Sequence, residues 1–131
     1  MSLRPFKHWT IRVAEFTQGR TPRSDDAFLA DCGLPDDPDA RRIALVVREI
    51  FAEEGSVDPK FIYAADRYPE DLEILPSWDS LDHLALIMRI EKKSDIRIPD
   101  RDVGNLCQPR FTVGEFIAVL VASCHRRRTA T

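Results

Sequence analysis

The sequence predicts an all-α protein, a small bundle of three main helices and one short helix that carries an N-terminal helical extension. Apolar residues recur at the three- and four-residue spacing of amphipathic helices in three separate segments. Residues that favour helix starts stand directly before each of these segments. The chain has 131 residues, of which 44% are hydrophobic and 31% charged, and this composition suits one domain with a single core.

The chain begins with a basic arm that precedes the three main helices. Four large apolar residues fall at helical spacing between basic ones: Phe6, Trp9, Val13 and Phe16. This spacing predicts an amphipathic basic helix that packs on the bundle, although alternation over residues 10–13 also allows a strand. A homodimer through these aromatic residues and contact with a membrane surface are alternative interpretations.

A connector and a short helix follow the arm. Residues 19–26, GRTPRSDD, have the composition of a linker. Residues 24–34 fit a short helix that Ser24 caps and Gly33 ends. We therefore divide the chain into an extension at 1–37, a main domain at 38–126 and a basic tail at 127–131.

The first main helix should begin at Pro38, because Asp36 or Asp37 can cap it and proline suits the first helical position. Gly55 is expected to end it. The long segment over residues 55–77 contains three prolines that break regular structure, and its apolar residues should hold it on the core. A short turn is expected near residues 59–64.

Asp79 is expected to cap the second main helix, with Asp82 in the capping-box position. Its apolar residues cover more of the circumference than one core face needs. A short helix is predicted after Pro99, and Thr112 with Glu115 forms a second capping box that opens the last helix. The three main helices and the short one together make the bundle.

Composition excludes several classes of protein. No apolar run reaches the roughly 18 residues of a membrane span, and the first residues lack the pattern of a secretory signal, so a cytoplasmic location is expected. Cys32, Cys107 and Cys124 are too widely spaced for a disulfide framework or a metal clip, and we expect reduced thiols and no metal site.

The charge distribution argues against nucleic-acid binding. Residues 1–23 carry five basic side chains against Glu15 alone, whereas residues 24–125 carry 11 basic and 21 acidic ones. An acidic body repels phosphate backbones and attracts partners that display Lys and Arg.

The order of these elements resembles the acyl carrier protein family over residues 38–125. The resemblance is carried by four groups of residues: Asp79-Ser80-Leu81-Asp82; Leu86, Ile87, Met88, Ile90 and Glu91; Ile96-Arg97-Ile98-Pro99-Asp100; and Phe111-Thr112-Val113 with Phe116 and Ile117. A lone Asp-Ser-Leu is a weak signal, but joined to Ile-Pro-Asp and a terminal amphipathic helix it becomes specific.

The resemblance implies that Ser80 is the hydroxyl to which a phosphopantetheinyl transferase attaches a covalent 4'-phosphopantetheine arm. The arm would carry acyl or aminoacyl groups as thioesters between acyl-loading and acyl-processing enzymes, and the carrier itself would not be an enzyme. Asp79, Asp82, Leu84 and Met88 would then be recognised by partners. Leu84 and Met88 are expected to be exposed, because Leu81, Leu86, Ile87 and Ile90 already fill an inner face.

Three observations bear on alternatives to this function and on the pathway. Asp79 and Asp82 could serve helix capping alone, in an unmodified carrier-like helical interaction module. Ser80 and His83 lie one turn apart, but no nucleophile elbow or oxyanion hole accompanies them, which argues against a hydrolase. Ala85 stands where the family leads us to expect glutamate, and Arg89, Lys92 and Lys93 dilute the usual acidity, which favours a specialised polyketide, peptide or modified-lipid pathway over ordinary fatty-acid synthesis.

Overall fold

The computed structural model describes residues 13–68, 70–72, 83–106 and 111–129, and within them the protein is helical, as predicted. Residues 13–17 form a single stretch of helix before the connector. The remaining helical elements are α2 (Asp25–Cys32), α3 (Pro38–Gly55), η1 (Pro59–Phe61), η2 (Glu70–Leu72), α4 (His83–Ser94), α5 (Asp100–Leu106) and α6 (Val113–Thr129).

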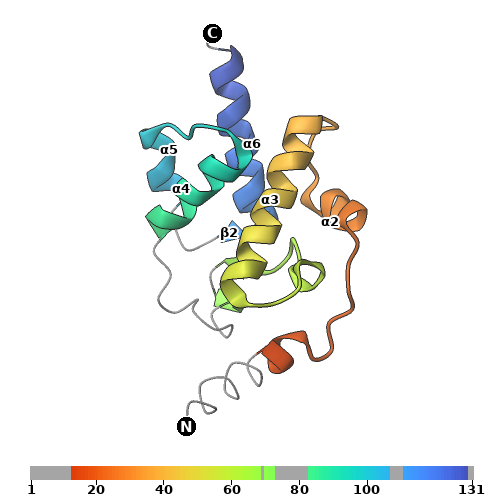
Figure 1. Ribbon diagram of the computed structural model, residues 1–131. Helices are drawn as coiled ribbons and strands as arrows, with labels where there is room; N and C mark the ends of the chain where they lie inside the picture. The colour runs from red at the N-terminus through yellow and green to blue at the C-terminus, as the bar shows by residue number, and fades with distance from the viewer. Residues whose placement is uncertain (1–12, 69, 73–82, 107–110, 130–131) are drawn as a thin grey trace.

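Helices α3 and α6 form the centre of the bundle, where the Phe51 and Phe116 rings lie 5.6 Å apart. Figure 1 shows α4 and α5 on one side of this pair and α2 on the other. Both rings are fully buried, and burying a side chain of this size contributes about 1.5–3 kcal/mol to folding. The α3–α6 contact is therefore the frame on which the other helices pack.

The predicted caps of α2 and α6 are confirmed. The Ser24 hydroxyl accepts a hydrogen bond from the Ala27 N–H at 3.1 Å, and Gly33 ends α2 in the left-handed conformation. At α6, the Glu115 N–H donates to the Thr112 hydroxyl and the Thr112 N–H donates to the Glu115 carboxylate, both at 3.1 Å. Each of these caps satisfies N–H groups that the first turn of a helix leaves without a partner.

Helix α3 begins as predicted, with Asp37 as its cap and Pro38 at its first position, and it ends at Gly55, as predicted. The helix includes Gly55, which is buried, and Ser56 takes the left-handed conformation with φ 56°. The Ser56 N–H donates to Glu53 O at 3.2 Å and the Val57 N–H to Ala52 O at 3.0 Å. These two bonds satisfy the last carbonyls of α3.

A two-residue antiparallel pair was not predicted. Strand β1 (Arg67–Tyr68) pairs with β2 (Phe111–Thr112), with Arg67 opposite Thr112 and Tyr68 opposite Phe111. The pair joins the segment after α3 to the start of α6, and Gly114 sits where an added Cβ would come within 3.3 Å of Ala64. A larger residue at position 114 would require Ala64 to shift by a few tenths of an ångström.

The extension contributes to the same core as the main domain. Phe28 of α2 is fully buried, Phe16 is 5% exposed, and α2 contacts both α3 and α6. Packing of the arm on the bundle is thus observed for residues 13–17, whereas residues 1–12 lie outside the described part. The boundary at 37/38, the basic tail and a homodimer through the arm stay predictions.

Candidate functional site

The predicted attachment segment lies outside the described residues. Asp79, Ser80 and Asp82 fall in the range 73–82, and the described chain resumes at His83, the first residue of α4. The roles of these three residues therefore stay predictions, and so does the hydrolase alternative that pairs Ser80 with His83, whose side chain is not described. What the structure describes is the helix that follows Ser80 and the elements that hold this helix.

Helix α4 separates into an inner and an outer face. Leu86, Ile87 and Ile90 are at most 2% exposed, whereas Leu84 is 54% and Met88 60% exposed. The expected exposure of Leu84 and Met88 is confirmed, and they are the exposed large hydrophobic residues among those described. A partner surface could cover both, because residues four apart lie next to each other on one helix face.

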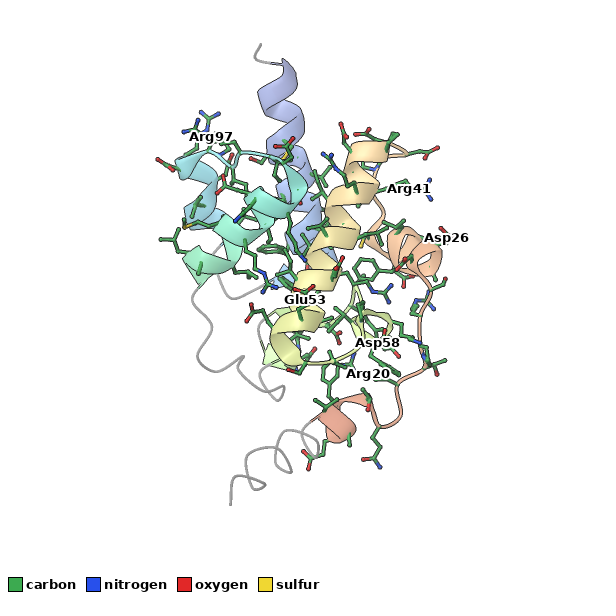
Figure 2. The ribbon with its side chains drawn as sticks, viewed as in Figure 1. Arg20, Asp26, Arg41, Glu53, Asp58 and Arg97 are labelled. Atoms are coloured by element: carbon green, nitrogen blue, oxygen red, sulfur yellow. The ribbon has the colours of Figure 1, made fainter. Side chains whose placement is uncertain are left out.

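The flank of α4 that faces α3 is held by ion pairs. Arg89 donates hydrogen bonds to Glu53 and Glu54 of α3. Lys93 reaches Glu53 at 3.1 Å and Glu49 at 3.7 Å. Figure 2 labels Glu53 on the side of α3 that lies toward α4. The positive charges of Arg89 and Lys93, which dilute the acidity of α4 in the sequence, are thus balanced by glutamates of α3.

The connection from α4 to α5 contains the Ile-Pro-Asp segment. The Ile98 N–H donates to the Glu91 carboxylate at 2.8 Å, and the Ile98 side chain is buried. Pro99 accepts a hydrogen bond from the Asp102 N–H at 2.9 Å in the first turn of α5. The Ser123 hydroxyl of α6 donates to the buried Asp102 carboxylate at 2.6 Å. Together these contacts fix α5 against both α4 and α6.

A buried arginine on α3 holds the extension, and sequence reasoning missed it. Arg48 is 1% exposed and donates to Ile62 O at 3.1 Å, Arg23 O at 2.8 Å and the Asp25 carboxylate at 3.0 Å. Its guanidinium lies 4.4 Å from the centre of the Phe28 ring. Burial lowers the pKa of Arg48, while the nearby Asp25 charge acts in the opposite direction.

A second arginine ties the connector to the segment after α3. Arg20 makes two hydrogen bonds to the Asp66 carboxylate, at 2.9 and 2.7 Å, and one to Phe61 O at 3.0 Å. It also lies 4.0 Å from the centre of the Phe16 ring and 4.7 Å from that of Tyr63. Figure 2 labels Arg20 below η1, at the end of the chain's first described helix. Arginine suits such a site because its planar group can pair with a carboxylate and stack on rings together.

The described part of the chain holds no group of three or more His, Cys, Asp or Glu residues that could bind a metal ion. Cys32 is a free thiol there. Burial, with a smaller contribution from the Asp31 charge, raises the pKa of Cys32 to about 11. No helix within these residues is long and apolar enough to cross a membrane.

Comparison with known proteins identifies the family. The chain is 37% identical to the acyl carrier protein of Campylobacter curvus over 60 residues, which are 46% of this chain and 73% of the relative. It is 35% identical to the acyl carrier protein of Kineococcus radiotolerans over 72 residues, 55% of this chain and 79% of the relative. The acyl carrier protein of Wolinella succinogenes is 31% identical over 71 residues, 54% of this chain and 83% of that protein.

The chain belongs to the acyl carrier protein family. No family model matches it, and no solved structure matches it either. Members of the family are carriers with a phosphopantetheine prosthetic group, and they work with acyl-processing enzymes.

Proposed function

We propose that this carrier transports acyl or aminoacyl groups as thioesters on a 4'-phosphopantetheine arm attached to Ser80. The observation that carries the proposal is the Asp-Ser-Leu segment, which precedes α4 in a chain of the acyl carrier protein family. A phosphopantetheinyl transferase would place the arm on the Ser80 hydroxyl, and acyl-loading and acyl-processing enzymes would act on its thiol. The carrier supplies the attachment point and catalyses nothing itself.

The residues present fit this group. A serine hydroxyl can form the required phosphate ester, and Ser80 stands three residues before the first described residue of α4. A phosphodiester near a helix N-terminus is favoured by about 0.3–1 kcal/mol, because the N–H groups and the helix dipole attract an anion. Asp79 and Asp82 oppose this modestly through their charge, and we assign them to capping and partner recognition.

We further propose that Leu84 and Met88 contact the partner enzymes and that these enzymes belong to a specialised polyketide, peptide or modified-lipid pathway. Two exposed apolar side chains one turn apart support the contact. The exposed Ala85 and Lys92 support the pathway, because this face of α4 offers little acidity to an enzyme that recognises an acidic strip.

Intact mass measurement tests the attachment. The full chain is incubated with coenzyme A and a broad-specificity phosphopantetheinyl transferase, and we expect its mass to rise by one arm. Ser80→Ala should abolish the rise. Ser77→Ala is the matched control, since it removes the nearest other hydroxyl of the same segment, and it should be modified like the natural sequence.

The second candidate function is an unmodified carrier-like interaction module. The neutralised basic residues of α4 and the extension that packs into the core favour it, since neither is needed to present an arm. An unchanged mass, under conditions that modify a control acyl carrier protein completely, would support the module and contradict attachment at Ser80.

A further inference from the structure

The exposed face of α4 carries a positive charge, Lys92, near its C-terminal end, and the proposed attachment at Ser80 assigns no role to this residue. Leu84, Ala85, Met88 and Lys92 are all exposed and follow one another at intervals of one, three and four residues, so they share one face of the helix. We call these four residues the Lys92 strip. Leu84 and Lys92 are eight residues apart, about 12 Å along the helix axis.

The charged neighbours of the strip are already engaged. Arg89 pairs with Glu53 and Glu54 of α3. Glu91, on the other flank, accepts the Ile98 N–H at 2.8 Å. Among the described residues no carboxylate lies within ion-pair distance of Lys92, although Asp95 is exposed one turn further on.

The α3–α4 ion pairs therefore determine which charges the Lys92 strip presents to a partner. Lys93 is adjacent to Lys92 in the chain, yet its ammonium group is directed to Glu49 and Glu53. The basic charges that face α3 are cancelled there, so the outward face presents two half-exposed apolar side chains and one positive charge. A basic partner would meet Lys92 as a like charge, while Arg89 and Lys93 already balance two of the three negative charges that the α3 glutamates carry on the neighbouring flank.

We propose that the Lys92 strip docks a partner protein that offers an apolar surface next to a carboxylate, with the apolar surface covering Leu84 and Met88 and the carboxylate meeting Lys92. The inference rests on the proposed function in that the partner is an enzyme that handles cargo carried on Ser80. Exclusion of water around the two apolar side chains provides the contact, and the single cation sets orientation and selectivity.

An anionic lipid surface also combines apolar and negative groups, but the strip suits it poorly. Membrane-binding helices combine a large apolar face with several basic residues. Here two large apolar residues and one lysine share the face, and the neighbouring basic side chains are held by α3.

The probe for the test is a pair of designed helical peptides with the same leucine face, one flanked by glutamate and the other by lysine. Each is titrated into the isotope-labelled full chain, and backbone amide shifts are followed by NMR. We expect the shifts to concentrate on residues 84–92 and the acidic peptide to bind about threefold to tenfold more tightly.

Variants assign the preference to the strip. Lys92→Gln should make the two peptides bind equally, and Lys92→Glu should reverse their order. Met88→Ser should weaken both peptides while leaving the preference in place. Lys60→Glu is the matched control, because it makes the same charge change at another exposed lysine, on η1, and it should leave the acidic peptide preferred. Thermal melts confirm that each variant is folded.

The proposal is overturned if the basic peptide binds equally well or better, if the shifts fall away from α4, or if phosphatidylserine vesicles reproduce them while the peptides do not. Ser80→Ala separates this result from the proposed function. It removes the arm but should bind the peptides unchanged, so a failed mass shift and a failed docking preference are read independently.

Discussion

One arginine fixes each side of helix α3, Arg48 of α3 itself toward α2 and Arg89 of α4 on the opposite side, and the two differ in burial. Toward α2, Arg48 is 1% exposed and serves two backbone carbonyls as well as Asp25. Toward α4, Arg89 is 36% exposed, and its partners among the described residues are carboxylates that water also reaches. The first side fixes the fold, whereas charges on the second side can change with little loss of stability.

The difference follows from what each arginine leaves behind when it is removed. Loss of Arg48 would strand the buried acceptor Ile62 O, at a cost of about 1–3 kcal/mol, and would also remove the partner of the part-buried Arg23 O. Loss of Arg89 would leave Glu53 and Glu54 hydrated, and exposed pairs of this kind contribute about 0.2–1 kcal/mol. The side of the bundle that includes the proposed docking face is thus the one that tolerates sequence change.

The largest expected effect is that of Arg48→Met, which keeps much of the side-chain volume but removes every donor. We expect the free energy of unfolding to fall by about 3 kcal/mol in urea denaturation, because two carbonyls lose their partner. Arg42→Met is the control on the same helix, since Arg42 is 49% exposed and its ion pair within the described part of the chain is with Asp39. A loss below about 1 kcal/mol for Arg48→Met would contradict the assigned role.

The alkylation rate of the Cys32 thiol reports how firmly α2 is packed. Since burial raises its pKa to about 11 from 9.0, the folded protein at pH 8 should hold about a hundredfold less thiolate than the unfolded chain. Alkylation by iodoacetamide, followed by peptide mass mapping, should therefore be about a hundredfold slower at Cys32 than in urea, and Cys32→Ala identifies the signal. Rapid reaction of the folded protein would show that α2 opens readily.

The same pKa shift has a consequence for stability at high pH. The folded state keeps the Cys32 proton to a higher pH than the unfolded chain, so stability is lost as pH rises from about 9 toward 11. Cys32→Ala should reduce this loss in urea denaturation measured at pH 8 and pH 10. An identical decline in both proteins would mean that other groups control it.

Arg20→Gln should have an intermediate effect. The variant leaves the Asp66 carboxylate, 5% exposed, with the Tyr63 N–H at 2.8 Å as its described partner, and we expect a loss of about 2 kcal/mol. Arg41→Gln is the control, because Arg41 is 51% exposed and its pairs with Asp26 and Asp36 are 3.6 and 3.9 Å long. Figure 2 labels Arg41 and Asp26 on α3 and α2 at the outer edge of the molecule. Equal losses in the two variants would show that the contacts of Arg20 add nothing.

Local signals account for what the sequence predicted correctly. Ser24, Pro38 and the Thr112–Glu115 box mark helix starts because their chemistry acts within one turn. The inner face of α4 was predictable for the same reason, since Leu86, Ile87 and Ile90 repeat at helical spacing.

What could not be predicted depends on contacts distant in the chain. Arg48 lies on the buried face of α3, four residues after Ala44 and three before Phe51, but periodicity cannot identify partners for its charge, and its three acceptors are 14 to 25 residues away. The β1–β2 pair is too short to show alternation. The pairing of Arg89 and Lys93 with α3 required the packing of two helices, and it is this pairing that leaves Lys92 as the outward cation of the strip.

The smallest loss of stability is expected for Glu53→Gln. This variant also tests most directly whether the two sides of α3 differ. Glu53 accepts hydrogen bonds from both Arg89 and Lys93, yet it is 40% exposed, so we expect a loss of about 0.5 kcal/mol at low ionic strength. That loss should disappear near 1 M salt, where exposed charges are screened within about 3 Å, whereas the loss from Arg48→Met should persist because the Arg48 side chain and its bond to Ile62 O are buried. Urea denaturation of both variants at the two salt concentrations measures this. A loss for Glu53→Gln that matches Arg48→Met, or that salt does not reduce, would show that α4 is held as rigidly as α2. The two sides of α3 would then not differ in the way their burial indicates.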